Sequence, residues 1–212
     1  MVLVGVVLAV AAPVTIGNVK GRTMNKFLSF VMVLMVTMFT SVAFAWSPPP
    51  APADGGYVVD LTGKLSSAHK SLLNHKIEQM NRDTANEYGI LLVPSMNGAT
   101  IEDVANSTYR AWGVGKKGLD NGCLIVVAVA ERKSRIETGK GVEGDVPDLK
   151  ANDILKRNLN PHLRNGDFYG GFDETLTALN SQIVSHRAEA NKAAAATTGG
   201  GAPQATGGCT CR

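Results

Sequence analysis

The stretch Cys123-Leu124-Ile125-Val126-Val127-Ala128-Val129 is apolar throughout, with no polar residue at alternate positions. A strand with one face in water alternates apolar and polar residues, whereas a strand covered on both faces reads as a continuous apolar run. This stretch therefore predicts a central strand between two layers of helices. The polar connection 131–134 and the segment 135–138 after it predict a hairpin partner at the edge of the sheet.

Two strands and two helices are expected before this central strand. The segments 57–60 and 89–94 have the apolar, β-branched composition of short strands. Ser66 is a candidate N-cap for a helix between them, because apolar residues follow it at helical spacing. The pattern Thr100-x-x-Asp103 resembles a capping box and opens a second helix before the central strand.

Two more helices are expected after the hairpin, from about 147 to 160 and from about 172 to 190. The resulting order is β-α-β-α-β-β-α-α, with helices between the early strands. Such an order requires helices on both faces of one sheet. We therefore predict the α/β class, as a three-layer α/β/α sandwich around a small mixed sheet of about four strands.

The N-terminal segment reads as an export signal. The first 45 residues carry three basic side chains and no acid, and an apolar run over 27–45 ends in Ala43-Phe44-Ala45. This ending is the small-x-small pattern that a signal peptidase accepts. We predict a leader over residues 1–45, with Met24 as an alternative start and cleavage before Trp46. The open alternative is an uncleaved anchor, since the run is nearly long enough to cross a bilayer.

Composition also divides the part of the chain after the leader. Residues 46–56 are rich in proline and are expected to form a stiff linker. The folded domain is expected over 57–190. Residues 191–212 are rich in alanine and glycine and are expected to be disordered. Cys209 and Cys211 form a Cys-x-Cys in this tail without a histidine beside them, and their role stays open.

The sequence disfavours several classes of function. The net charge of +3 belongs to the leader, because the rest of the chain carries 18 basic and 18 acidic residues. We therefore predict no nucleic-acid binding. The motifs of serine hydrolases, phosphate-binding loops and zinc proteases are absent. The four histidines lie among polar neighbours, as solvated histidines do, and Cys123 reads as a small buried thiol.

Oxygen-bearing side chains at predicted loops leave one kind of site open. Asp60 ends the first strand, Asp120 and Asn121 precede the central strand, and Glu143 and Asp145 lie in the Gly-rich loop 139–145. Calcium prefers several carboxylate and carbonyl oxygens on flexible loops, so these residues are candidate ligands if the fold brings them together. The alternative is that the same residues serve only as turn formers.

Several stretches in order resemble one family, the TPM domain. This domain is known from a thylakoid-lumen protein of photosystem II repair and from bacterial envelope proteins of the YgcG type. The resemblance covers the whole expected domain and rests on the segments 57–60, 65–66, 101–105, 112–115, 120–128, 132–144 and 165–171.

The resemblance carries expectations beyond those of the residues alone. It implies a Rossmann-like α/β/α sandwich located outside the cytoplasm. It also implies calcium binding at acidic loops, which would fall on Asp60, Asp120, Asn121 and Glu143 here. A low acid-phosphatase activity is a further implication, although no residue of this sequence has the profile of an activated nucleophile.

Three functions remain in competition at this stage. The first is an exported cation-binding module for interaction or assembly, with envelope or membrane proteins as partners. The second is a metal-dependent acid phosphatase of low activity, and the third is a structural envelope domain without a ligand. The expected location is periplasmic or extracellular, with membrane anchoring if the leader is not cleaved.

Overall fold

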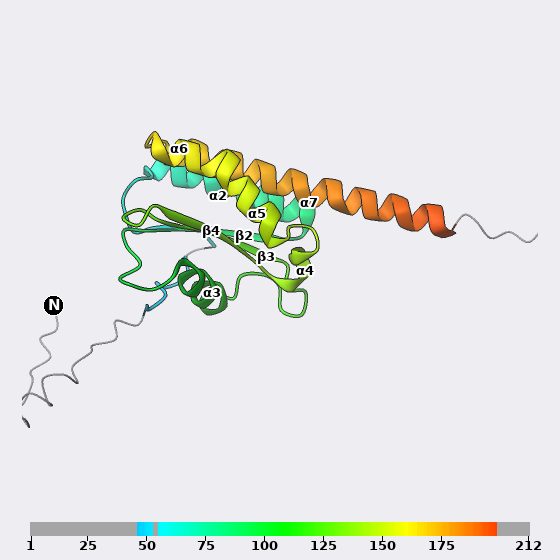
Figure 1. Cartoon of the computed structure of the whole chain (residues 1–212), viewed down its shortest axis with the longest axis horizontal. Helices are drawn as coiled ribbons and strands as arrows, with labels where there is room; N and C mark the ends of the chain where they lie inside the picture. The colour runs from blue at the N-terminus through cyan, green and yellow to red at the C-terminus, as the bar shows by residue number, and fades with distance from the viewer. Residues whose placement is uncertain (1–45, 53–54, 199–212) are drawn as a thin grey trace, which may run out of the picture. The chain divides into compact units, whose positions relative to one another are not determined.

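The computed structural model describes residues 46–52 and 55–198. Its centre is a four-stranded sheet in the order β1-β2-β3-β4, with helices on both faces (Figure 1). The strands are β1 (Val58–Asp60), β2 (Glu87–Val93), β3 (Gly122–Ala128) and β4 (Lys133–Thr138). The predicted leader cleavage site, Cys209 and Cys211 lie wholly or partly outside the described residues.

The pairing of the strands makes the sheet mixed. The strands β1, β2 and β3 are parallel, and β4 joins β3 in antiparallel orientation. Every residue of β3 is buried, which confirms the prediction of a central strand covered on both faces. The hairpin partner predicted at the sheet edge is β4.

The helices begin where their capping residues predict. Ser66 accepts a hydrogen bond from the amide of His69, and Thr100 accepts one from the amide of Asp103. The remaining helical segments follow β4 in the chain. The helices are α2 (Ser67–Thr84), α3 (Ile101–Trp112), α4 (Lys140–Glu143), α5 (Asp148–Ile154), the π-helix η1 (Leu155–Leu159), α6 (Asn160–Arg164) and α7 (Phe168–Thr198).

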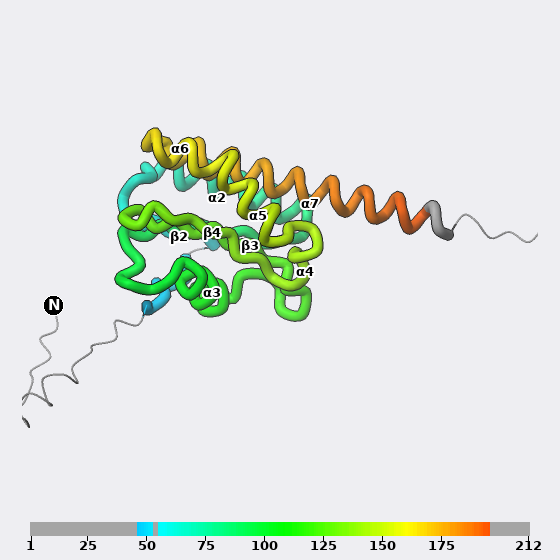
Figure 2. The backbone as a smooth tube through the Cα atoms, viewed as in Figure 1, coloured from blue at the N-terminus to red at the C-terminus, as the bar shows by residue number. Residues whose placement is uncertain are grey.

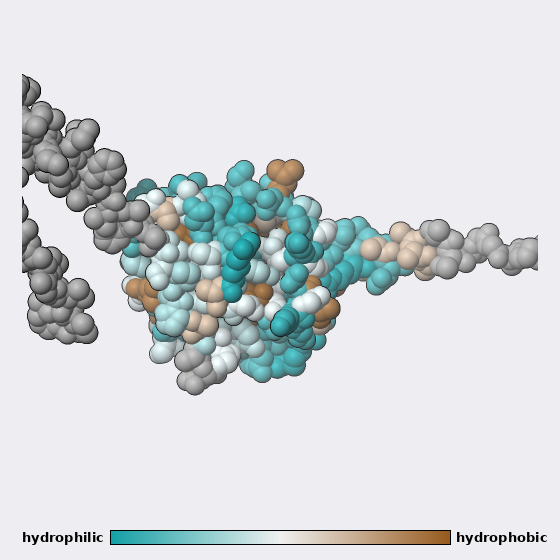
Figure 3. Space-filling model, turned by 90° about the horizontal axis from the view of Figure 1, so that it is seen from below, coloured by the Kyte–Doolittle hydropathy of each residue, from teal (hydrophilic) through white to brown (hydrophobic). Residues whose placement is uncertain are grey.

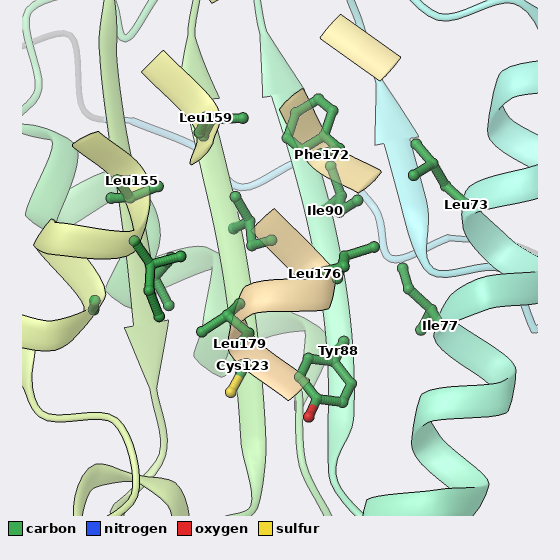
Figure 4. Close-up of a cluster of buried hydrophobic side chains, with 14 of the residues drawn as sticks. Leu73, Ile77, Tyr88, Ile90, Cys123, Leu155, Leu159, Phe172, Leu176 and Leu179 are labelled. Carbon is green, nitrogen blue, oxygen red and sulfur yellow. The ribbon is translucent and has the colours of Figure 1, made fainter. Parts of the chain in front are cut away.

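Two hydrophobic cores lie on the two faces of the sheet. On one face, α2, η1 and α7 press apolar side chains against β2 and β3, and Leu73, Leu159 and Phe172 are fully buried there (Figure 4). On the other face, α3 packs against alternate residues of the same strands. The alternation follows from the period of two in a strand, and it confirms the α/β sandwich.

The two parallel crossovers have opposite hands. The chain moves by one strand in the same direction from β1 to β2 and from β2 to β3, yet α2 and α3 cover opposite faces. Two crossovers of the same hand would place both helices on one face. One crossover is therefore left-handed, which is rare. Because of this topology, α2 and α3, both in the first half of the domain, already cover the two faces of the sheet.

The structure differs from the expected domain limits at both ends. Part of the proline-rich segment lies against α3, because Trp112 donates its indole N–H to the Pro49 carbonyl at 2.9 Å and Trp46 packs on the same core. At the other end, α7 continues to Thr198, beyond the expected limit at 190 (Figure 2). Alanine is the strongest helix former, and it dominates this extension.

The face of the described part that carries α3 is mostly polar. Seen from the α3 side, hydrophobic residues form only small separate spots (Figure 3). Single exposed apolar side chains of this kind are normal on a protein surface and need no further explanation. Within residues 46–52 and 55–198, none of the helices is both long enough and apolar enough to span a bilayer.

Candidate functional site

The four candidate ligands lie at two ends of the sheet. Asp60 is the last residue of β1, and its register with Leu92 places it at the carboxyl end of the parallel strands. Asp120 and Asn121 precede β3 at the amino end, and Glu143 ends α4, which follows the antiparallel β4 back to that end. At about 3.3 Å per residue, Asp60 lies roughly 20 Å from Asn121 along the strands.

Asp60 has a structural role at its own end. Its Oδ1 accepts hydrogen bonds from the amide and hydroxyl of Thr62 and from the amide of Gly63, and its Oδ2 accepts one from Leu65. Burial raises the pKa of Asp60, but the bond from the Thr62 side chain and the three backbone amides outweigh it and hold the pKa below its ordinary value. The carboxylate organises the turn into α2.

Asn121 is also occupied by the fold. Its Oδ1 accepts a hydrogen bond from the amide of Lys116 at 2.7 Å, and its Nδ2 donates to the carbonyl of Ala85. The residue is only 7% exposed. Asn121 thus ties the loop before β3 to the end of α2, and one lone pair of Oδ1 is left for another contact.

Gly139 and Gly141 allow the loop that leads to Glu143 to contact the loop that carries Asp120 and Asn121. The amide of Gly141 donates to the carbonyl of Asp120 at 3.0 Å. A Cβ atom at Gly139 would collide with the carbonyl of Asp120, and one at Gly141 would collide with the carbonyl of Leu119. The Gly-x-Gly pattern therefore allows the two loops to touch through their backbones, and α4 with Glu143 starts directly at the contact.

The carboxylates of Asp120 and Glu143 are free for a ligand. Both residues are exposed, and within the described part of the chain no hydrogen bond or ion pair engages either carboxylate. Asp120 has a φ of 46°, a left-handed conformation that aspartate tolerates better than most residues. The structure thus brings Asp120, Asn121 and Glu143 to one end of the sheet and leaves Asp60 at the other.

The oxygen atoms at this end are of the kind that a hard cation accepts. Calcium takes six to eight oxygen ligands, and carboxylates, amide oxygens and backbone carbonyls are all of the accepted kind. Among the residues that the structure describes, no group of three or more His, Cys, Asp or Glu side chains could hold a metal ion. Two free carboxylates with nearby carbonyls would therefore need water or a partner to complete the coordination.

Asp145, a further candidate ligand, belongs instead to a polar network beneath this end. Asp145 follows α4. Its carboxylate accepts a hydrogen bond from Nε of Arg187 at 2.7 Å and forms a second hydrogen bond with Nδ1 of His186 at 2.8 Å. Arg187 also donates to the Thr84 carbonyl and to Oδ1 of Asn86. Nothing in the sequence signals this pairing, because α7 follows Asp145 only after three other helical segments.

The thiol beside this network is not a reactive group. Burial raises the pKa of Cys123 to about 12; the charge of Arg187 lowers it and the charge of Asp145 raises it by smaller amounts. The side chain is fully buried, as the sequence predicted. A thiol in this state acts as a small apolar residue rather than as a nucleophile.

The fold and this site define a small α/β sandwich with acidic loops at the amino end of its parallel strands. The chain belongs to the TPM domain family, whose model matches residues 58–182. This confirms the resemblance that the sequence motifs indicated. No match was found among curated protein sequences.

Solved structures agree with this assignment. The N-terminal domain of a protein from P. gingivalis is 30% identical with a TM-score of 0.59, and the match covers 66% of this chain and 94% of that one. The N-terminal domain of the cg2496 protein from Corynebacterium glutamicum is 18% identical with a TM-score of 0.50, covering 66% and 88%. The BA42 protein from Bizionia argentinensis is 19% identical with a TM-score of 0.50, covering 59% and 86%. The last two support the fold alone.

Proposed function

We propose that this chain is an exported cation-binding module that holds a protein partner in the cell envelope. The observation that carries the proposal is that the carboxylates of Asp120 and Glu143 have no partner among the described residues, on loops that Gly139 and Gly141 join through their backbones. Unpaired acidic side chains on a fixed backbone contribute little to the stability of the fold, because like charges repel. This arrangement suits a site that gains its counter-charge from a ligand.

The incomplete donor set suggests how the cation would serve binding. The protein offers two free carboxylates and one amide oxygen with a spare lone pair, so several coordination positions of a calcium ion stay open. An acidic or carbonyl group of a partner protein could occupy these positions. The cation would then bridge the two molecules, and the interaction would depend on both.

Calcium titration followed by amide NMR tests the site. We expect shifts concentrated around Asp120 and Glu143, and a loss of affinity of about tenfold or more in Asp120→Ala and in Glu143→Gln. Glu102→Gln is the control, because Glu102 is an exposed acid in the first turn of α3, which follows the carboxyl end of β2 at the opposite end of the sheet. Unchanged affinity in both site variants would refute the cation site.

Export is the second part of the proposal, and mass spectrometry of the expressed protein tests it. The basic start, the apolar run and Ala43-Phe44-Ala45 support processing before Trp46. We expect the mature protein to begin at Trp46. An intact leader on protein extracted from membranes would replace the processed form with an anchored one, without changing the cation site.

Phosphomonoester hydrolysis separates this proposal from the phosphatase alternative. A phosphatase needs a nucleophile or activated water, a proton donor and positive charge for the developing anion. The loops carry Lys116, Lys117 and Lys140 but no group with the profile of a nucleophile. We expect slow hydrolysis at best. Robust calcium- or magnesium-dependent turnover that Asp120→Ala abolishes would favour the enzyme.

A further inference from the structure

A second candidate site lies at the opposite end of the sheet. A cavity of about 560 Å³ opens where β3 ends, between the β3–β4 turn, α6 and the start of α7. Its walls include Val129, Leu163 and Phe168, and its polar groups come from Arg132, Asn160 and Arg164. Small-molecule sites commonly have this size, with a mostly apolar lining and a few polar groups. The carboxyl end of parallel strands is also where α/β sheets commonly bind ligands.

The charge of the cavity is one-sided. Of the residues that the structure describes, two arginines and no acid line it. Within the described residues, neither guanidinium forms a hydrogen bond or an ion pair, whereas Arg135, Arg157 and Arg187 are all paired with carboxylates. Arginine is the side chain best suited to hold a planar oxyanion through two parallel N–H donors. Two such side chains on one cavity without an internal partner favour an anionic ligand.

Asn160 adds a fixed polar group to the same wall. Its Oδ1 accepts a hydrogen bond from Oγ of Ser134 on β4 at 2.9 Å, which leaves the Nδ2 group as a donor without a partner in the described residues. The π-helix η1 directly precedes Asn160. An insertion of this type rotates the residues that follow it, and π-helical turns are frequent at functional sites.

The apolar part of the lining limits the ligand further. A highly hydrated anion such as inorganic phosphate would gain nothing from Val129, Leu163 and Phe168. A ligand with an apolar body would bury that body against these side chains. A carboxylate carries a single charge and costs less to desolvate than a phosphate dianion.

We propose that this cavity binds an amphiphilic carboxylate, with its apolar body inside the cavity and its head group paired with Arg132 and Arg164. Two sources supply this chemistry: a free fatty acid, and the C-terminal carboxylate of a peptide that ends in an apolar residue. Both present one carboxylate on an apolar body, and the test distinguishes them by the probe that binds more tightly.

The test uses the purified full chain with octanoate and N-acetylleucine as probes, followed by amide and methyl NMR. We expect saturable shifts at Val129, Leu163 and Phe168 for at least one probe. Acetate, which lacks the apolar body, and N-acetylleucine amide, which lacks the charge, should bind at least about tenfold more weakly. Tighter binding of octanoate indicates the fatty acid, and tighter binding of N-acetylleucine indicates the peptide terminus.

Two variants and one control test the head group. Arg132→Gln and Arg164→Gln should each weaken binding by about tenfold, because each removes a charge-assisted pair. Arg110→Gln is the matched control, because Arg110 is an exposed arginine on α3, on the other face. Arg→Lys variants at both positions keep the charge and should retain part of the affinity.

Three results would overturn the proposal. The first is the absence of saturable shifts at the cavity with both probes. The second is binding of N-acetylleucine amide as tight as that of the acid. The third is an affinity that both glutamine variants leave unchanged, with thermal melting showing that they remain folded. Shift mapping on the unmutated protein decides the matter even if an arginine variant fails to fold.

Discussion

Nε of Arg187 and Oδ2 of Asp145 lie 2.7 Å apart, and this ion pair joins the long helix α7 to the loop after α4. The Asp145 side chain is 12% exposed and the Arg187 side chain is 38% exposed, so the pair is shielded mainly on the carboxylate side. Through its other donors, Arg187 also reaches Thr84 and Asn86, which connect α2 to β2. The Arg187 side chain therefore links α7 to the loop after α4 and to the connection between α2 and β2, at the amino end of the sheet.

Asp145→Asn should destabilise the domain because it leaves Arg187 without its counter-charge. We expect a loss of about 1–3 kcal/mol in the free energy of unfolding, below the full cost of breaking a buried pair because Arg187 keeps contact with water. Urea unfolding measures it. Asp153→Asn is the control: Asp153 pairs with Arg157 at 3.6 Å on the surface, and its loss should change stability by less than about 0.5 kcal/mol. Equal effects would show that Asp145 is not specially shielded.

Gly141→Ala should damage both the fold and the proposed cation site. The added Cβ would collide with the carbonyl of Leu119, so the two loops that carry Asp120 and Glu143 would have to separate. We expect a loss of about 1–3 kcal/mol, together with weaker calcium binding. Gly144→Ala is the control, since nothing lies within 4 Å of a Cβ there. Its stability should be unchanged or slightly higher. Normal stability and affinity in Gly141→Ala would show that the loops need no close contact.

Much of the fold could be predicted from local patterns. The apolar run at 123–129 predicted a strand covered on both faces, and Ser66 and Thr100 predicted helix starts, because these signals lie within a few neighbouring residues. The Asp145–Arg187 pair could not be predicted, since its partners are 42 residues apart in the chain. Only the packing of α7 against the sheet brings them together.

The separation of Asp60 from the other candidate ligands had a signal in the sequence. Asp60 is the last residue of its strand, whereas Asp120 precedes its strand, and in parallel strands these positions fall at opposite ends of the sheet. The helical extension of α7 to Thr198 had a signal as well. Its alanine content favours helix, although the same composition is common in disordered tails.

His162 should make stability depend on pH near neutrality. Hydrogen bonds to Asp167 and Glu174 raise the pKa of His162 above its ordinary value. Because the folded-state pKa exceeds the unfolded-state value of about 6.5, the stabilising contribution is complete below that pH. It disappears as the pH rises through the folded-state pKa.

Thermal unfolding across this range measures the effect as a difference between the original protein and His162→Gln. The difference in melting temperature should be largest on the acidic side and should shrink as the pH rises. His75→Gln is a suitable control, because His75 is a surface histidine whose ring bonds only Gln79 among the described residues. A difference that grows with pH would mean that His162 is stabilising as a neutral ring.

Asp60→Asn tests whether the carboxylate of Asp60 stabilises the fold or binds calcium. In the native turn both oxygens accept hydrogen bonds, and the amide of Leu65 donates to Oδ2 at 2.8 Å. In the variant, an NH₂ group takes the place of one oxygen, and a donor then faces a donor. We expect a loss of about 1–3 kcal/mol in the free energy of unfolding, with calcium affinity unchanged.

The pH profile of this variant gives an independent check. The folded-state pKa of Asp60 is held below its ordinary value, so its contribution is present above the unfolded-state pKa of about 3.9 and disappears as the pH falls through the folded-state pKa. Asp60→Asn should therefore be less stable than the original protein at neutral pH and should approach it in acid. Asp120→Asn should show the reverse combination, with weaker calcium binding and little change in stability. Its carboxylate has no partner within the described residues, and asparagine tolerates the left-handed φ of 46° at this position. If Asp60→Asn instead lost calcium affinity as strongly as Asp120→Asn while remaining folded, a cation would have to bind at the carboxyl end of the sheet, and the amino-end site proposed here would be wrong.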